Sequence, residues 1–262
     1  MVTEQLISNV IQLLDKAHEK HQSIIPLTIQ EPTMTIDDAY AIQVKRIKIA
    51  TMLGDRITGK KIGLTSFAMQ NLLGVDQPDY GHLLESMYVE EGAEISLSQL
   101  FQPKIEGEIA FVLKEDLVGP NVTVDDVLRA TDYVVPALEV VDSRIKDWKI
   151  KLEDTVADNA SCGLYVLGSN KVHISDVNLI SIHMQLLKNN QVINEGKGMD
   201  VLGDPALCVA WLANKLSEYG VTLKAGEVIL SGALSAAVVV EKGDQFTAKF
   251  TQIGEVNVHF VE

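Results

Sequence analysis

Two glutamates one residue apart are the first side chains in this sequence whose types and spacing could do chemistry. Residues 104–112 alternate in character, which predicts a strand with Glu106 and Glu108 side by side on one face. Adjacent carboxylates repel each other, so they need either solvent or a cation between them. An exposed outer face would satisfy the pair, but Ala110 and Val112 continue the same face with apolar residues. We therefore expect the face to point inward.

A third acid strengthens the case for a cation site. Glu139 interrupts the otherwise apolar segment 134–141, and Gly107, between the first two glutamates, would allow close approach to the strand. Burying an unpaired carboxylate costs several kcal/mol, on the order of 2–7 for a polar group without a partner and more for a charge. Three such groups together predict a hard divalent cation, and ligation by oxygen alone favours Mg²⁺ or Mn²⁺ over zinc or copper.

Other motifs do not hold together. Residues 54–60 fit the start of a phosphate-binding loop, but Lys61 occupies the position that needs a hydroxyl, and the segment follows a predicted helix. Ser143 and Lys146 have the spacing of a nucleophile pair without the rest of that signature. The six histidines have no ligand-like grouping, which argues against zinc.

Composition limits the partners and the compartment. The 262 residues carry 36 acidic and 22 basic side chains, a net charge of −14, which argues against nucleic acid or an anionic membrane surface as a partner. No run approaches the ~20 apolar residues of a membrane helix, and residues 1–22 lack a signal-peptide pattern. Cys162 and Cys208 are isolated in apolar surroundings, so we expect buried reduced thiols and a cytoplasmic protein.

The elements that must position these residues can be read from periodicity. Helical spacing predicts helices over 3–20, from Thr35 to Gly54, from Thr123 onward, and over 204–220; Thr35 and Thr123 each precede an aspartate at capping-box spacing. Period-two alternation predicts strands at 105–113, 134–141, 163–167, 180–187, 191–194, 227–231, 236–241, 245–251 and 255–260, with hairpin turns at 188–191 and 241–244. We expect an α+β, β-rich protein in which an N-terminal helical cap, 1–58, adjoins one compact catalytic domain, 59–262.

Five ordered segments carry a resemblance to a known family, namely 59–66, 73–81, 103–110, 136–144 and 154–163, and 227–234 extends it towards the C-terminus. The chain resembles the hydratase/decarboxylase family of the fumarylacetoacetate hydrolase-like superfamily, which contains 2-oxopent-4-enoate (2-hydroxypenta-2,4-dienoate) hydratases. The resemblance implies a fumarylacetoacetate hydrolase-like core of mixed sheets.

The resemblance also implies roles for particular residues. By themselves, Lys61 could be a solvated surface lysine, Asp79 a turn residue and Ser161 a buried hydroxyl. The matched motifs instead imply that the metal ligands are Glu106, Glu108 and Glu139. They imply that the catalytic residues are Lys61 and Asp79, and that the substrate-binding residues are Ser161 and Asp158.

The activity implied is metal-dependent hydration of 2-hydroxypenta-2,4-dienoate to 4-hydroxy-2-oxopentanoate, in the meta-cleavage catabolism of aromatic compounds. The cation would act as a Lewis acid, Lys61 would transfer protons, and Asp79 would position or activate water. Two alternatives stay open: decarboxylation of 4-oxalocrotonate (2-oxo-3-hexenedioate), and a non-catalytic partner subunit of a pathway complex. Residues 143–148 and 154–163 favour the hydratase. Relatives of this kind imply a homo-oligomer and a possible complex with a neighbouring pathway enzyme.

Overall fold

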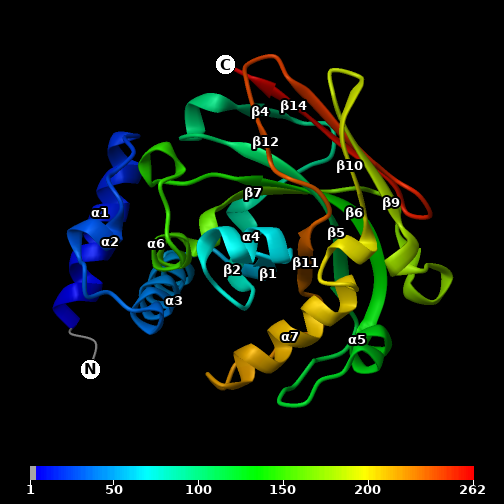
Figure 1. Cartoon of the computed structure of the whole chain (residues 1–262), viewed down its shortest axis with the longest axis horizontal. Coiled ribbons are helices and arrows are strands. Elements are labelled where there is room, and N and C mark those ends of the chain that lie inside the picture. The colour runs from blue at the N-terminus through cyan, green and yellow to red at the C-terminus, as the bar shows by residue number, and fades with distance from the viewer. Residues whose placement is uncertain (1–3) are drawn as a thin grey trace.

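Two β-sheets packed face to face form the body of the protein (Figure 1). The computed structural model describes residues 4–262, apart from the side chains of residues 72 and 73. The larger sheet has the order β2 (Asp79–Leu84), β1 (Ile57–Gly63), β11 (Val228–Ala233), β5 (Lys104–Leu113), β6 (Thr131–Val141), β7 (Cys162–Leu167) and β3 (Tyr88–Val89), with β12 (Val238–Val239) on β5 and β8 (Val172–His173) on β6. The smaller sheet has the order β10 (Gln191–Lys197), β9 (His183–Lys188), β13 (Gln245–Phe250), β14 (Gly254–Val261) and β4 (Glu94–Ser96). Parallel pairs such as β1–β11 lie among antiparallel ones, so the sheets are mixed, as expected.

The larger sheet curls until strands that are not neighbours face each other across its concave side. The hydroxyls of Thr58 on β1 and Tyr165 on β7 lie 2.9 Å apart, and β1 also reaches β6 through a lysine–glutamate ion pair. A small apolar cluster lines this concave side: Leu83, Ala110, Val135, Ala137, Cys162, Tyr165 and Leu230. The curl therefore brings the inner faces of β1, β5, β6 and β7 together.

The convex side of the larger sheet packs on the smaller one, and this explains Gly107. A Cβ at that position would lie 3.2 Å from the Met184 sulfur on β9 and 3.4 Å from the Ala248 Cβ on β13. The close approach inferred from the sequence is thus made by the second sheet, on the side away from the glutamates.

Three helices precede the first strand and lie together at one side of the larger sheet (Figure 1): α1 (Glu4–Lys20), α2 (Leu27–Gln30) and α3 (Ile36–Met52). The apolar stripe expected for α1 is buried from Val10 to Ala17 and half-buried at Leu6, and the predicted capping box of Thr35 and Asp38 begins α3. Residue 3, the first of the expected helix, lies outside the described residues. The capping box at Thr123 likewise begins α5 (Val124–Ala130), and Asp204 caps α7 (Pro205–Ser217).

The helical portion is joined to the rest of the chain by polar contacts that are partly buried. Thr28 in α2 donates from its backbone N–H and its hydroxyl to the carboxylate of Asp154 in α6 (Leu152–Ala157), both at 2.9 Å. Ile24 exchanges backbone hydrogen bonds with the segment 144–146. The boundary expected at residues 58 and 59 therefore separates segments that share hydrogen bonds.

One hairpin prediction is confirmed and one is wrong. Residues 188–191 join β9 to β10 as an antiparallel hairpin. Residues 241–244 do form a turn, but β12 before it pairs with β5 in the larger sheet, whereas β13 after it pairs with β9 and β14 in the smaller one. Alternation identifies a strand from local information, and it carries none about the partner. The chain crosses between sheets at this turn.

Other elements differ from the sequence-based expectation in extent. The strand expected at 180–187 begins at His183, since 179–181 form a short 3₁₀ turn. Eight elements lie outside the ranges expected from periodicity: α2, α4 (Phe67–Leu73), α6, β1, β2, β3, β4 and β8. In the part of the chain that the structure describes, no helix has both the length and the apolar character needed to cross a bilayer.

Candidate active site

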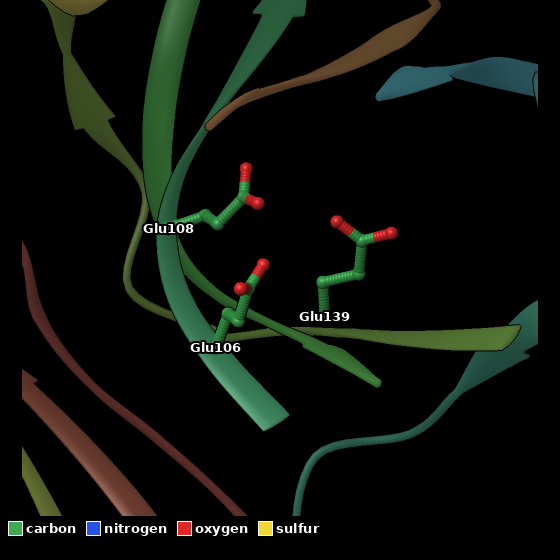
Figure 2. A group of neighbouring side chains, drawn as sticks. All are labelled: Glu106, Glu108 and Glu139. Carbon is green, nitrogen blue, oxygen red and sulfur yellow. The ribbon is translucent and has the colours of Figure 1, made fainter. Parts of the chain in front are cut away.

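The three glutamates meet on the concave side of the larger sheet, as Figure 2 shows. Register explains why: Glu106 on β5 lies directly opposite Glu139 on β6, and Glu108 follows two residues along the same face of β5. One carboxylate oxygen from each of the three lies within 4.8 Å of the others. Glu108 and Glu139 are 1% and 0% exposed, so the cluster is an inward-facing one, as the apolar continuation of that face predicts.

Burial and mutual repulsion dominate the electrostatics of this cluster. Burial, reinforced by the charge of Glu139, raises the pKa of Glu106 to about 7. Burial also raises the pKa of Glu108 well above its usual value, with further contributions from Glu139 and Glu106. Burial and the neighbouring acids therefore oppose ionisation of these two carboxyls. A bound cation would favour ionisation and lower both pKa values.

The hydrogen bonding of the cluster fits a cation as well. Both carboxylate oxygens of Glu139 are buried; within residues 4–262, Oε2 has no hydrogen-bond partner, and Oε1 has an ion pair with Lys61 but no hydrogen bond of good geometry. Glu108 Oε2 accepts one hydrogen bond, 2.7 Å long, from the backbone N–H of Gly232, whose φ of +112° suits glycine. Oxygens left without protein donors in a group of three carboxylates form the kind of ligand set that Mg²⁺ and Mn²⁺ prefer.

Lys61 and Lys60 point to opposite sides of β1, and only Lys61 reaches the carboxylates. The Nζ atom of Lys61 lies 3.2 Å from Glu139 Oε1, and its side chain is 5% exposed. Burial lowers the pKa of Lys61, but the charges of Glu139 and Asp79 outweigh burial and hold the pKa above its ordinary value. Lys61 is therefore an ammonium group here. Lys60 instead pairs with Glu227 Oε1 at 3.1 Å, and burial lowers its pKa.

Asp79 lies beside Lys61 because β2 pairs with β1. Its Cα is opposite that of Gly63, where a Cβ would approach Asp79 Oδ1 to 2.2 Å and Lys61 Nζ to 3.4 Å. Burial raises the pKa of Asp79, and the positive charge of Lys61 partly offsets this. No group in the described part of the chain hydrogen-bonds Asp79 Oδ1, so this buried oxygen is free to take a proton or a hydrogen bond from a ligand.

Ser161 ends a turn of three consecutive left-handed residues, Asn159 to Ser161, with φ of 57°, 52° and 52°. Its hydroxyl lies 3.0 Å from that of Thr155. The next residue, Cys162, is buried close to the carboxylates: burial raises the pKa of its thiol, and the charge of Glu139 raises it further. The turn therefore sets Ser161 directly before a residue whose side chain lies close to the acid cluster.

Asp158 is occupied by a neighbouring arginine. Its carboxylate accepts hydrogen bonds from the backbone N–H of Arg144 at 2.9 Å and from Arg144 Nε at 2.6 Å, and Arg46 Nη1 lies 3.9 Å away. Its side chain has no exposed surface. Direct substrate binding by Asp158 stays a prediction from the resemblance, whereas the contacts observed are those of a residue that supports the turn.

The sequence assigned no role at the site to several residues that the structure places at or near it, above all Gly232, Arg144 and Cys162. Gly232 and Arg144 fall within segments of the family resemblance, which was the available signal; their contacts needed the fold. A cavity of about 460 Å³ adjoins the turn and is bordered by Arg46, Arg144 and Cys162 among others. Cys162 thus separates this cavity from the acid cluster.

Comparison with known proteins agrees with this arrangement. The model of the family described as fumarylacetoacetate (FAA) hydrolase, C-terminal, matches residues 68–261. The chain is 47% identical over 264 residues to a 2-hydroxyhexa-2,4-dienoate hydratase of Comamonas testosteroni, covering 100% of both chains. It is 48% identical over 217 residues to a 2-hydroxypent-2,4-dienoate hydratase of Pseudomonas putida, covering 82% of this chain and 98% of the relative.

Among solved structures, a 4-oxalocrotonate decarboxylase from Pseudomonas putida G7, in complex with magnesium and adipate, superimposes with a TM-score of 0.96. It is 36% identical, and the match covers 100% of this chain and 99% of that one. The fold, the buried acid cluster and these similarities lead to one conclusion: the chain belongs to the fumarylacetoacetate hydrolase family.

Proposed function

We propose that the protein is a hydro-lyase that adds water to 2-hydroxypenta-2,4-dienoate, giving 4-hydroxy-2-oxopentanoate. The observation that carries the proposal is the position of the Lys61 ammonium, 3.2 Å from one of three clustered carboxylates whose oxygens can take a cation. The hydratases that are 47% and 48% identical to the chain support this activity over others on the same fold.

Glu106, Glu108 and Glu139 would hold Mg²⁺ or Mn²⁺, which supplies Lewis-acid polarisation of the substrate's carboxylate and 2-oxygen when bound. A divalent ion is also what the 36% identical decarboxylase structure contains. Among the residues that the structure describes, the buried Oε2 of Glu139 has no hydrogen-bond partner, which supports the assignment independently of that neighbour.

The residues of the chain would supply the proton transfers. The reaction needs the proton of the 2-hydroxyl to leave and a proton to be added at C5, which gives the conjugated 2-oxo acid. Water then adds its oxygen at C4, while a proton is added at C3. The Lys61 ammonium would give its proton to C5 and take up the 2-hydroxyl proton in exchange. In the hydration step Asp79, with a free buried oxygen, would take a proton from the water, Lys61 would give one to C3, and the proton held by Asp79 would then restore the ammonium. Ser161 would donate a hydrogen bond from its hydroxyl to the bound substrate.

We propose further that the protein works in the cytoplasm as a homo-oligomer and that a neighbouring pathway enzyme is an additional partner. Two buried free thiols, Cys162 and Cys208, support a reducing compartment. Large apolar side chains that are strongly exposed, such as Met52, Leu53 and Phe67 at 78%, 84% and 71%, support a protein interface. Light scattering after size exclusion tests the oligomer: a monomer at micromolar concentration would contradict it.

The activity is tested by following the ultraviolet absorbance of 2-hydroxypenta-2,4-dienoate. We expect the absorbance to fall with enzyme and Mg²⁺, the loss to stop when a chelator is added, and activity to return with excess Mg²⁺. Absence of any effect of the chelator would contradict the metal-dependent mechanism. The six-carbon homologue 2-hydroxyhexa-2,4-dienoate should be compared in parallel, because one relative is named for it.

Decarboxylation is the second candidate, and the TM-score of 0.96 to a 4-oxalocrotonate decarboxylase is the observation in its favour. Incubation with 2-oxo-3-hexenedioate and measurement of CO₂ distinguishes the two. Rapid CO₂ release, together with slow loss of the dienoate, would replace the hydratase proposal by this one.

A further inference from the structure

The turn that carries Ser161 has a conformation that its own sequence does not favour. Asn159, Ala160 and Ser161 are all left-handed, and none of them is glycine. Left-handed backbone is unfavourable for residues with a Cβ and persists where surrounding contacts determine it. Contacts outside the turn must therefore hold it.

The first of these contacts ties the turn to β2. The side chain of Asn159 accepts a hydrogen bond from the backbone N–H of His82 at 2.8 Å and donates one to the backbone oxygen of the same residue at 2.9 Å. A Cβ at Gly81 would lie 2.4 Å from the backbone oxygen of Asn159, so the turn lies directly on the strand. That strand begins with Asp79.

A single side chain from the N-terminal helices completes the arrangement. Gln43 of α3 is 1% exposed, and its amide donates to the backbone oxygens of Tyr80 at 3.0 Å and Val156 at 2.9 Å. Its oxygen lies 3.0 Å from Nδ1 of His82, which therefore carries the hydrogen. These three hydrogen bonds of the amide therefore join Gln43 to β2 and to α6, the two elements that flank the turn.

We propose that Gln43 is a positioning residue: it holds the turn 159–161 against β2 and so fixes Ser161 relative to Asp79. We call the three side chains of Gln43, His82 and Asn159 the Gln43 network. Arg46, one helical turn further along α3, approaches Asp158 at the start of the turn to 3.9 Å, so the same face of α3 supports both sides of it. The N-terminal helices thereby belong to the catalytic apparatus, and this inference rests on the proposed function for its effect on turnover.

The test uses the two buried cysteines as reporters in one molecule. Cys162 directly follows the turn, whereas Cys208 lies in α7, outside the Gln43 network; both are 1% exposed. Gln43→Leu removes all three hydrogen bonds of the amide while keeping a buried side chain of similar size. Ile42→Ala, at a fully buried neighbour in α3, is the control for general destabilisation.

With Mg²⁺ present, we expect Gln43→Leu to accelerate maleimide labelling of Cys162 at least tenfold, with labelling of Cys208 unchanged within twofold, as mass spectrometry resolves. Ile42→Ala should change both rates by a common factor. In the dienoate assay, kcat of Gln43→Leu should fall at least tenfold, with the Mg²⁺ concentration for half-activation unchanged within threefold, because the network does not contact the three glutamates.

Unchanged labelling of Cys162 in Gln43→Leu, or equal acceleration at both cysteines, would overturn the positioning role. So would a tenfold change in the Mg²⁺ requirement without a fall in kcat. Wild-type protein that does not turn over the dienoate would overturn the proposed function alone, since the labelling result still decides the role of Gln43. If Gln43→Leu does not fold, Gln43→Glu, which keeps the acceptor for His82 and loses both donated hydrogen bonds, is judged by the same criteria.

Discussion

Protonation of His82 should destabilise the protein in mildly acidic solution. The imidazole is 7% exposed, and burial, with a smaller contribution from the charge of Lys60, lowers its pKa from 6.5 to about 3. Its Nδ1 hydrogen bond to Gln43 Oε1, 3.0 Å long, is made by the neutral ring. Between pH 6.5 and about 3 the unfolded chain therefore binds a proton at this residue that the folded protein does not bind.

The sign and size follow from this difference. Unfolding takes up a proton, so the contribution of His82 to stability is complete above pH 6.5 and is lost as the pH falls. At pH 5.0 the protonated form of this imidazole exceeds the neutral form about thirtyfold in the unfolded chain. This excess lowers the free energy of unfolding by about 2 kcal/mol relative to its value at pH 7.5. This figure holds for any folded pKa below about 4.5, so it depends little on the depth of the shift.

The assay is denaturant unfolding followed by tryptophan fluorescence at pH 7.5 and 5.0, for the wild type and for His82→Gln, without metal. All other titrating groups are common to both proteins. Each protein loses free energy of unfolding between pH 7.5 and 5.0, and the difference between the two losses is therefore the contribution of His82. We expect the wild type to lose about 2 kcal/mol more free energy of unfolding than the variant over this interval. Equal losses would show that His82 is protonated in the folded protein and would refute the assignment of a buried neutral ring.

Three further predictions concern the site. Lys61→Met should lower kcat by about 10²–10⁴-fold, as loss of a general acid–base group does. Lys60→Met, on the opposite side of the same strand, should change kcat less than about tenfold and should lower the melting temperature, since it leaves Glu227 unpaired. Steady-state kinetics and thermal unfolding distinguish the two variants. Comparable losses of kcat in both would contradict the assignment of Lys61. Glu139→Gln should abolish Mg²⁺ binding in calorimetry, because it removes one of the three carboxylates of the cluster; a retained binding isotherm would exclude Glu139 as a ligand. Gly63→Ala should inactivate the enzyme, since its Cβ would lie 2.2 Å from Asp79 Oδ1, and wild-type kcat in this variant would show that the Asp79 position is not critical.

Much of the local structure could be predicted because local patterns determine it. Capping boxes at Thr35 and Thr123 mark where α3 and α5 begin, and alternation over 104–112 sets Glu106 and Glu108 on one face of β5. The presence of Glu139 in an apolar segment signalled a buried acid. These features depend on residues a few positions apart in the chain.

Periodicity did not delimit the strands that carry Lys61 and Asp79, for a related reason. β1, residues 57–63, contains two lysines and two glycines, and all four residues 59–62 are buried, so the alternation that marks a half-exposed strand is absent. All six residues of β2 are buried as well, which again removes the period of two. Only the resemblance to a known family pointed to these residues from the sequence.

The sequence by itself determined which side chains could form a cation site and where several elements begin, because helix caps and strand alternation depend on residues only a few positions apart. Tertiary structure decided the rest. The register of β5 on β6 set Glu139 opposite Glu106, and the curl of the larger sheet selected Lys61 rather than Lys60. Strand pairing and sheet curvature join residues far apart in sequence, through backbone hydrogen bonds that do not depend on side-chain identity, so the local pattern contains no record of them.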